Sequence, residues 1–351
     1  MPRISKFFAN SKVADWSGRA IGGGGGGGDI ITEGGEVSVY PNPNGGWYTV
    51  HWMTSSTTFK VHSGTVENAD VLILGAGGTA NNHPMLPGIS TGVTNGGGGG
   101  AGAWIDLTGE TFTTTGGPGG NGQYPIVVGA GSHTGGTQGG DTVAFGSTAP
   151  GGGFGGRPGT KGNDGGSGGG GPGYYHPTPT SWGQPTPGPP SVGDNDHPSG
   201  NPGGFGGWNP GSSGSYYVYI AGGGGGGSGP TGSAGTPFDQ WPSHPSWAFG
   251  GLRGEGSYNN YRTGSPQKYA GGGYGGGSYQ GPYPGPNQMT HPSRMTHSYP
   301  GPEGGTPDES SHRRQREGCA GNGYSQSTWQ TIQLIYDSAP GVVIVRYPVG
   351  A

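Results

Sequence analysis

Residues 71–80 have the spacing of a nucleotide-binding motif. The apolar run 71–74 (VLIL) leads into 75–80 (GAGGTA), which matches a strand followed by the G-x-G-x-x-A loop of dinucleotide-binding proteins. That loop must open a helix and be followed about twenty residues later by an acidic residue. Here Asn-Asn-His-Pro follows at 81–84, and Pro87 comes soon after. Because 91 of the 351 residues are glycine, such a match is expected by chance, and no nucleotide site is predicted.

Histidine and acidic residues could bind a metal ion or transfer protons, but their spacing favours neither. A histidine before a proline has an extended backbone, so we interpret these residues as loop positions whose rings pack on neighbouring prolines. Asp194 and Asp196 lie near one of them, His197, and could bind a cation, although solvated loop residues are the favoured interpretation. Five of the ten histidines precede proline: His83, His176, His197, His244 and His291.

Two further kinds of site lack their required residues. The single cysteine, Cys319, excludes an internal disulfide framework and every zinc site built on cysteine pairs, so it is predicted to be a free thiol. The segment 159–162 (GTKG) lacks the Gly-Lys-Ser/Thr order of a phosphate-binding loop. We expect no catalytic residue, no metal site and no cofactor.

Aromatic residues in proline-rich inserts are the stronger candidates for a binding site. The inserts are 172–190, 236–247 and 279–302. Rings at loop tips can stack on sugars or anchor protein contacts. Alternatively, these rings fold back and shield glycine backbone from water, and the sequence leaves both alternatives open. The candidate binding residues are Tyr174, Tyr175, His176, Trp182, Trp241, His244, Trp247, Tyr283 and Tyr299.

Unbroken runs of glycine must position these inserts. The longest runs are Gly22–Gly28, Gly96–Gly100, Gly168–Gly171 and Gly222–Gly227. Low aliphatic content is typical of disorder, but charged residues are only 10% of the chain, the net charge is −4, and aromatic residues reach 10%. The composition therefore favours an ordered structure that lacks an ordinary hydrophobic core. Between residues 151 and 320 the only Val, Ile or Leu residues are Val192, Val218, Ile220 and Leu252.

Glycines three residues apart indicate what that structure is. They recur every three positions from Gly153 to Gly171 and from Gly223 to Gly235, which is the repeat of the polyproline II helix. Collagen is disfavoured because its triplets must continue without interruption. Ordering a residue costs about 1–2 kcal/mol, whereas one net hydrogen bond contributes about 0.5–1.5 kcal/mol. An isolated glycine helix is therefore unstable. In a polyglycine II lattice of many such helices, direct backbone hydrogen bonds between the helices can offset the entropy cost of ordering them.

The two ends of the chain predict β-strands instead. Short runs rich in β-branched and aromatic residues are separated by turn signals such as Pro-Asn-Pro-Asn-Gly-Gly at 41–46. The nearly continuous apolar runs 70–74 and 341–347 suit strands buried on both faces, and we expect them to lie together in a β base. We see no helical periodicity. The expected strands are 36–40, 47–53, 58–62, 70–74, 103–107, 125–129, 216–220, 329–336 and 341–347.

The predicted fold class is all-β or irregular. A small β base, formed by N- and C-terminal strands, carries a polyglycine II sandwich with long Pro/aromatic loops and essentially no α-helix. No window approaches the 18 apolar residues of a membrane span, and residues 1–18 lack the apolar core of a signal peptide. The net charge of −4 and the absence of a basic patch argue against nucleic acid binding.

The paired end motifs resemble a known class of protein. The segment 47–78 (WYTVHWMTSSTTFKVHSGTVENADVLILGAGG) and the segment 341–348 (GVVIVRYP) enclose glycine-rich inserts. This arrangement, from about 47 to 348, resembles the glycine-rich domains of bacteriophage virion proteins, which are common in tail fibres of marine and cyanobacterial phages. The middle is also similar to the tail-tip adhesins of T4-like phages, in which polyglycine II sandwiches carry variable loops that contact the host receptor.

The resemblance implies a non-enzymatic virion protein that attaches the particle to its host as a tail fibre or adhesin, on the virion surface. Its partners would be other virion proteins, through an attachment segment at 1–32, and a host polysaccharide or outer-membrane protein. A homotrimer is a state expected of a fibre. A capsid decoration or head-fibre protein is the alternative, and an ice-binding polyglycine protein is disfavoured by the bulky inserts. Beyond the attachment segment, the predicted organisation is a base with first glycine runs at 33–150, a polyglycine II body at 151–325 and returning strands at 326–351.

Overall fold

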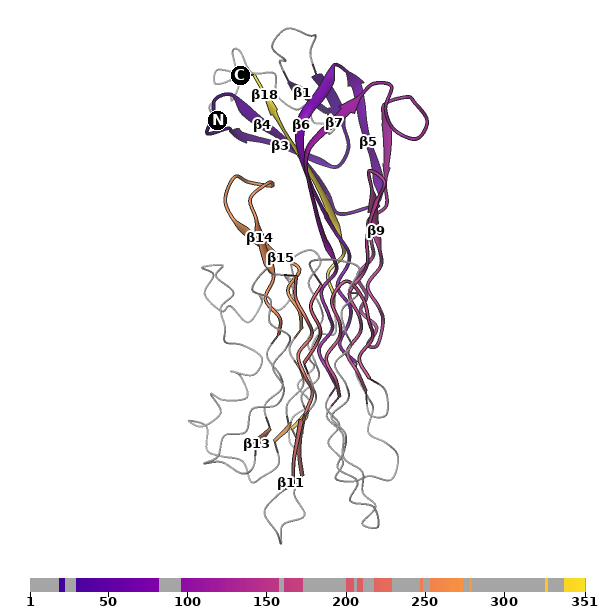
Figure 1. The fold of residues 1–351 in the computed structure, drawn as a ribbon, viewed down its shortest axis with the longest axis vertical. Coiled ribbons are helices and arrows are strands. Elements are labelled where there is room, and N and C mark those ends of the chain that lie inside the picture. The colour runs from indigo at the N-terminus through magenta and orange to yellow at the C-terminus, as the bar shows by residue number, and fades with distance from the viewer. Residues whose placement is uncertain are drawn as a thin grey trace, which may run out of the picture.

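The structure is a computed structural model, and its architecture is all-β. It describes residues 19–22, 30–81, 96–157, 161–172, 200–204, 207–210, 218–228, 247–248, 253–273, 275, 278–279, 326–327 and 338–350. Within these ranges there is no helix, as the sequence predicted. Figure 1 shows an elongated molecule with two sheets at its upper end and the glycine segments running below them.

Two antiparallel sheets form the base. The first has the order β3-β4-β18-β6-β7 and the second the order β1-β2-β5-β8. The first consists of β3 (Glu36–Pro41), β4 (Trp47–Met53), β18 (Val342–Val349), β6 (Thr65–Leu74) and β7 (Trp104–Thr113). The second consists of β1 (Arg19–Gly22), β2 (Ile30–Glu33), β5 (Thr57–Ser63) and β8 (Gln123–Ile126).

The apolar ends of the chain meet in the middle of the larger sheet, as predicted. β18 pairs with β6 from Val342↔Leu74 to Arg346↔Asp70. Side chains alternate along β18, so Val343 and Val345 enter the core between the sheets, while Ile344 enters a second core on the opposite face. A strand buried on both faces needs apolar side chains at successive positions, which explains the continuous hydrophobic run.

The remaining strands are short. They are β9 (Thr142–Ala144), β10 (Ser147–Ala149), β11 (Gly207–Pro210), β12 (Val218–Ala221), β13 (Trp247–Ala248), β14 (Ser257–Asn259), β15 (Gln267–Tyr269), β16 (Ser278–Tyr279) and β17 (Gln326–Ser327). The predicted strands 36–40, 47–53, 58–62 and 341–347 coincide closely with β3, β4, β5 and β18. The runs 70–74 and 103–107 cover about half of the longer strands β6 and β7, and 216–220 overlaps β12 in the described residues 218–220. The run 329–336 lies outside the described residues. The run 125–129 is shifted: β8 ends at Ile126, Val127 forms an isolated bridge to Val143, and Gly129 already belongs to the glycine lattice.

Below the base, glycine segments bond to one another with a period of three residues. Segment 96–103 illustrates the pattern. Its amides at 97, 100 and 103 donate to the carbonyls of 156, 153 and 150 at 2.7–3.0 Å. Its amides at 98 and 101 donate at 3.0 Å to a different segment, at the carbonyls of 223 and 226. Adjacent residues bond to different segments, and the same partner segment recurs every third residue, as in a threefold helix, so this is the predicted polyglycine II packing.

The glycines singled out from the sequence obey the same rule. The amides of Gly153 and Gly156 donate to the carbonyls of residues 167 and 170, and those of Gly223 and Gly226 donate to residues 171 and 168. The lattice also includes 75–81, 96–103 and 129–140, which the sequence assigned to the range of the base with first glycine runs.

The base extends directly into the lattice. β6 and β7 pair at Ile73↔Ile105 and Leu74↔Trp104, and the same two chains continue as Gly75 N–H to Ala103 O (3.0 Å) and Gly78 N–H to Gly100 O (2.9 Å). The hydrophobic base therefore brings glycine segments together in a set register. This pairing reduces the conformational entropy that the lattice alone must overcome.

A row of buried, hydrogen-bonded side chains crosses the core between the two sheets. His51 Nδ1 donates to the Gly34 carbonyl at 2.7 Å, which leaves Nε2 as an acceptor 2.9 Å from Thr32 Oγ1. The hydroxyl of Tyr347 lies 2.6 Å from the same Thr32 oxygen. These contacts are satisfied if the Tyr347 hydroxyl donates to Thr32 Oγ1 and Thr32 Oγ1 donates to Nε2 of a neutral His51 imidazole. Burial lowers the pKa of His51 to about 4, although its hydrogen bond to the Gly34 carbonyl opposes this.

We expect substitution of a lattice glycine to destabilise the protein strongly. A Cβ at Gly100 would lie less than 3.0 Å from the backbone carbonyl of Ser167, whereas a Cβ at the exposed Gly119 would meet only the side chain of Asn121, at 3.3 Å. Gly100→Ala should cost about 3 kcal/mol of unfolding free energy through overpacking. Gly119→Ala should change it by less than about 0.5 kcal/mol. Thermal unfolding followed by circular dichroism measures both, and equal melting temperatures would contradict the close packing.

Stability should fall in acid because of His51. The unfolded imidazole has a pKa of 6.5 and the folded one about 4, so the folded state binds fewer protons between these values. The contribution of neutral His51 to the free energy of unfolding is complete above pH 6.5. It is lost progressively as the pH falls to 4, and the total loss is about 3 kcal/mol. Urea unfolding at several pH values measures it. His51→Gln should be less stable at pH 7 but should have a flatter pH profile, and profiles of equal slope would refute the assignment.

Candidate functional site

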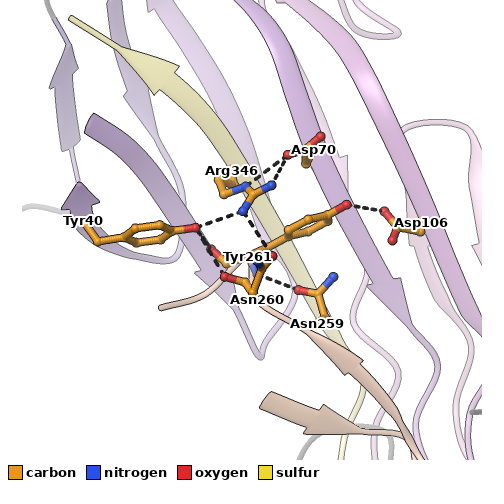
Figure 2. Close-up of polar contacts among 7 residues, drawn as sticks. All are labelled: Tyr40, Asp70, Asp106, Asn259, Asn260, Tyr261 and Arg346. Carbon is orange, nitrogen blue, oxygen red and sulfur yellow. Dashed lines mark hydrogen bonds and ion pairs between the residues drawn. The ribbon is translucent and has the colours of Figure 1, made fainter. Parts of the chain in front are cut away.

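The polar cluster shown in Figure 2 is centred on Arg346 of β18. Arg346 is two residues after Ile344 and so lies on the same face of the larger sheet as the second core, away from the smaller sheet. Its Nε donates to Asp70 Oδ2 of β6 at 3.1 Å, and its Nη2 donates to the same oxygen. Its Nη1 donates to the hydroxyl of Tyr40 on β3 and to Asn260 Oδ1, each at 3.2 Å. Burial lowers the pKa of Arg346, but the hydrogen bonds to Asp70 and Tyr40 outweigh it and the net shift is upward, so the guanidinium stays charged.

Aromatic rings enclose the same guanidinium. Its carbon lies 4.5 Å from the ring centroid of Tyr48 and 4.2 Å from that of Tyr261. A second cation–π pair lies nearby, because the guanidinium of Arg262 stands 3.4 Å above the ring of Trp52. Tyr261 and Arg262 belong to the turn of the hairpin β14–β15, whereas Tyr48 and Trp52 belong to β4. The hairpin is therefore held on the sheet by planar cations that stack on rings.

The hairpin turn is hydrogen-bonded to β3 and β7, in addition to Arg346 of β18. Tyr40 Oη of β3 donates to the carbonyl of Tyr261 at 3.1 Å, and Tyr261 Oη donates to Asp106 Oδ1 of β7 at 2.8 Å. Asn259 Oδ1 accepts from the Tyr261 amide at 2.7 Å, which shapes the turn. Burial and the bond to Asp106 raise the pKa of Tyr261. Burial likewise raises the pKa of Asp106, although the bond from Tyr261 opposes it.

We call Tyr40, Asp70, Asp106, Asn259, Asn260, Tyr261 and Arg346 the hairpin clamp. Its charged and hydroxyl groups bond to one another, and the raised pKa of Tyr261 prevents this hydroxyl from acting as a base near neutral pH. The geometry thus attaches the hairpin to the base. The sequence analysis did not identify these residues. A signal was present, because Arg346 is the charged residue within the apolar run 341–347 and Asp70 begins the run expected to pair with it.

Eight of the nine candidate binding residues lie outside the described ranges: Tyr174, Tyr175, His176, Trp182, Trp241, His244, Tyr283 and Tyr299. The ninth, Trp247, begins β13 and pairs with Tyr279 of β16. β16 pairs in parallel with β17. Asp194, Asp196 and His197 also lie outside the described ranges.

The described residues that adjoin the three predicted inserts lie at the end of the lattice opposite the base. Insert 236–247 ends in β13 and insert 279–302 begins in β16, and these two strands are hydrogen-bonded and both contact β12. Insert 172–190 follows Gly171, whose carbonyl accepts from the amide of Gly223 at 2.8 Å, two residues after the end of β12. Figure 1 shows β11 and β13 at this lower end. We call this region the distal end.

Residues 75–80 do not form a nucleotide loop. They run as an extended lattice segment, in which Ala76 and Thr79 donate to the carbonyls of 140 and 137 at 3.0 Å, and no helix follows within the described residues. Across the described ranges, no group of three or more His, Cys, Asp or Glu residues gathers as metal ligands would. The same ranges contain no helix long and apolar enough to cross a membrane.

Neither a scan against protein-family models nor a search of curated proteins yields a match.

We expect the hairpin clamp to stabilise the β14–β15 hairpin. Tyr261→Phe removes the hydroxyl that bonds Asp106 and should cost about 0.5–1.5 kcal/mol, the net value of one hydrogen bond, because water can replace the hydroxyl at the exposed Asp106 carboxylate. Hydrogen exchange should accelerate in 257–269 more than in β6. Tyr258→Phe is the matched control, since Tyr258 is on the same hairpin but 55% exposed. If both variants unfold at the same urea concentration as the parent, the clamp does not hold the hairpin.

Proposed function

We propose that this protein is a non-enzymatic bacteriophage virion protein that acts in host attachment, as a tail fibre or adhesin. The observation that supports it most is the separation of two ends. The two-sheet base lies at one end of an elongated molecule, and the described residues adjoining the three aromatic, proline-rich inserts lie at the other.

The packing of the glycine lattice suits a protein that attaches a particle to its host. Its interior consists of backbone that bonds laterally, so the lattice can hold inserts of varied sequence without depending on their side chains for a core. Two charged groups of the larger sheet, Arg346 and Asp70, are paired with each other in the clamp. Binding to a host surface would then depend on the inserts and on stacking by Tyr and Trp, as in other rigid scaffolds with variable loops.

The partners follow from this proposal. A base fitted to other virion proteins through the N-terminal segment 1–32 would leave the inserts displayed outward. Their ligand would be a host surface polysaccharide or an outer-membrane protein, and a homotrimer is the proposed fibre state. The alternative is a capsid decoration or head-fibre protein with a structural role, and the position of the protein on the particle separates the two functions.

An adsorption experiment tests the proposal. Particles carrying Trp182→Ala, Trp241→Ala and Trp247→Ala should adsorb to host cells at least about tenfold more slowly, since buried aromatic anchors each contribute about 2 kcal/mol or more to binding. Particles carrying Tyr258→Ala are the control, because that exposed ring lies on the hairpin beside the base. Particle number and content of the protein should stay unchanged. Unaltered adsorption by intact triple-variant particles would refute attachment through these inserts.

A further inference from the structure

In the larger sheet, the position between β4 and β6 is occupied by a strand from the far end of the sequence. β4, β5 and β6 follow one another in sequence, yet β4 and β6 lie in the larger sheet and β5 in the smaller one. β4 and β6 do not pair with each other. β18, more than 260 residues further along the chain, lies between them and is antiparallel to both.

Both neighbouring strands pair with β18, β4 along its whole length and β6 over residues 70–74. β18 pairs with β4 from Val343↔Met53 to Val349↔Trp47 and with β6 from Val342↔Leu74 to Arg346↔Asp70. Without β18, the facing backbone amides and carbonyls of two buried strands would lose their partners. Unpaired strand edges of this kind readily accept another strand.

Side chains on both faces specify which strand fits. Val343, Val345 and Tyr347 enter the core between the sheets, where Tyr347 bonds to Thr32. Ile344 enters the second core on the other face. Because successive side chains alternate between faces, a shift of one residue would place the wrong set in each core.

Arg346 adds a polar determinant of register. It is opposite Asp70 in the ladder and bonds to it, and it also contacts the hairpin through Asn260 and Tyr261. A shifted strand would leave Asp70, whose side chain is 21% exposed, without this partner. Loss of one member of a largely buried ion pair is strongly destabilising.

The residues that precede β18 attach to the lattice. The amide of Ser338 donates to the Ser132 carbonyl at 2.9 Å, the amide of Gly77 donates to the Ala339 carbonyl at 3.0 Å, and the amide of Gly341 donates to the Gly129 carbonyl at 2.9 Å. Residues 338–349, which we call the closing segment, therefore join both sheets, the lattice and the hairpin.

We propose that the edges of β4 and β6, with the adjoining lattice segments, form a strand-acceptor site. Its ligand is an extended peptide that is apolar on both faces and carries an arginine opposite Asp70. The closing segment occupies it in the structure, and the same segment from a second copy of this chain can occupy it by strand exchange. Main-chain bonds along both edges supply affinity, and the alternating side chains supply specificity. The proposal does not depend on the attachment function.

Cleavage of the folded full-length protein tests the acceptor site. A specific protease site placed within 328–337 is cut after folding, and we expect the fragment carrying the closing segment to co-elute with the body in size-exclusion chromatography. A fluorescent peptide of residues 338–350 should then replace the fragment on gentle warming. A matched peptide with Arg346→Glu should be incorporated at least tenfold less, because it places a carboxylate opposite Asp70. Departure of the fragment on cleavage, or equal incorporation of the two peptides, would overturn the proposal.

Exchange between copies is tested with uncut protein. Two preparations carrying different fluorophores are unfolded, mixed and refolded at high concentration, and dimers containing both labels are separated by size and detected by energy transfer. Excess unlabelled 338–350 peptide should reduce the doubly labelled dimer at least tenfold, whereas the Arg346→Glu peptide should leave it unchanged. Absence of the mixed dimer, or no effect of the competing peptide, would overturn strand exchange between copies.

Discussion

Close approach of glycine backbones is the constraint on which the rest of this structure depends. Segments of the lattice bond laterally to several neighbours at once, and each neighbour is contacted again every third residue. At interior positions such as Gly97, Gly152 and Gly225, an added Cβ would lie less than 3.0 Å from a carbonyl of the next segment. A side chain at these positions would separate the segments and break the bonds. Glycine here contributes to order, although its freedom in the unfolded chain makes that order costly.

The hydrophobic base offsets that cost. β6 and β7 are paired through apolar residues, and their pairing continues without a break into the glycine segments that follow and precede them. β18 is likewise preceded by lattice residues 338–341. The lattice thus begins from chains already held side by side. The clamp adds a further connection, because the hairpin β14–β15 rises from the lattice and is fastened to the sheet around Arg346.

This division of tasks also bears on function. In the described part of the chain, six groups have shifted pKa values: His51 and Tyr347 lie hydrogen-bonded in the core, and Tyr40, Asp106, Tyr261 and Arg346 fasten the hairpin. A scaffold that relies on backbone bonds leaves the sequence of its inserts unconstrained. That freedom is what a surface with changeable recognition loops requires, and it supports the proposed role in attachment.

Local features of the sequence determined much of this fold. Clusters of β-branched and aromatic residues located the strands of the base, and glycines three residues apart predicted the threefold packing, because both patterns act over a few neighbouring residues. The continuous apolar runs 70–74 and 341–347 even predicted that the two ends meet. The lattice segment 129–140 and the polar hairpin 257–269 were not found, since neither has a long glycine run or an apolar alternation.

Tertiary structure alone decided which segments became neighbours and what the charged residues do. Tyr40, Asp70, Asp106, Tyr261 and Arg346 lie far apart in sequence and meet only because four strands and a hairpin converge on one face. The choice of β18, rather than a nearer strand, to lie between β4 and β6 likewise depends on long-range pairing. A sequence pattern reports the periodicity of one segment. Which edge that segment meets is settled by the free energy of the whole packed chain.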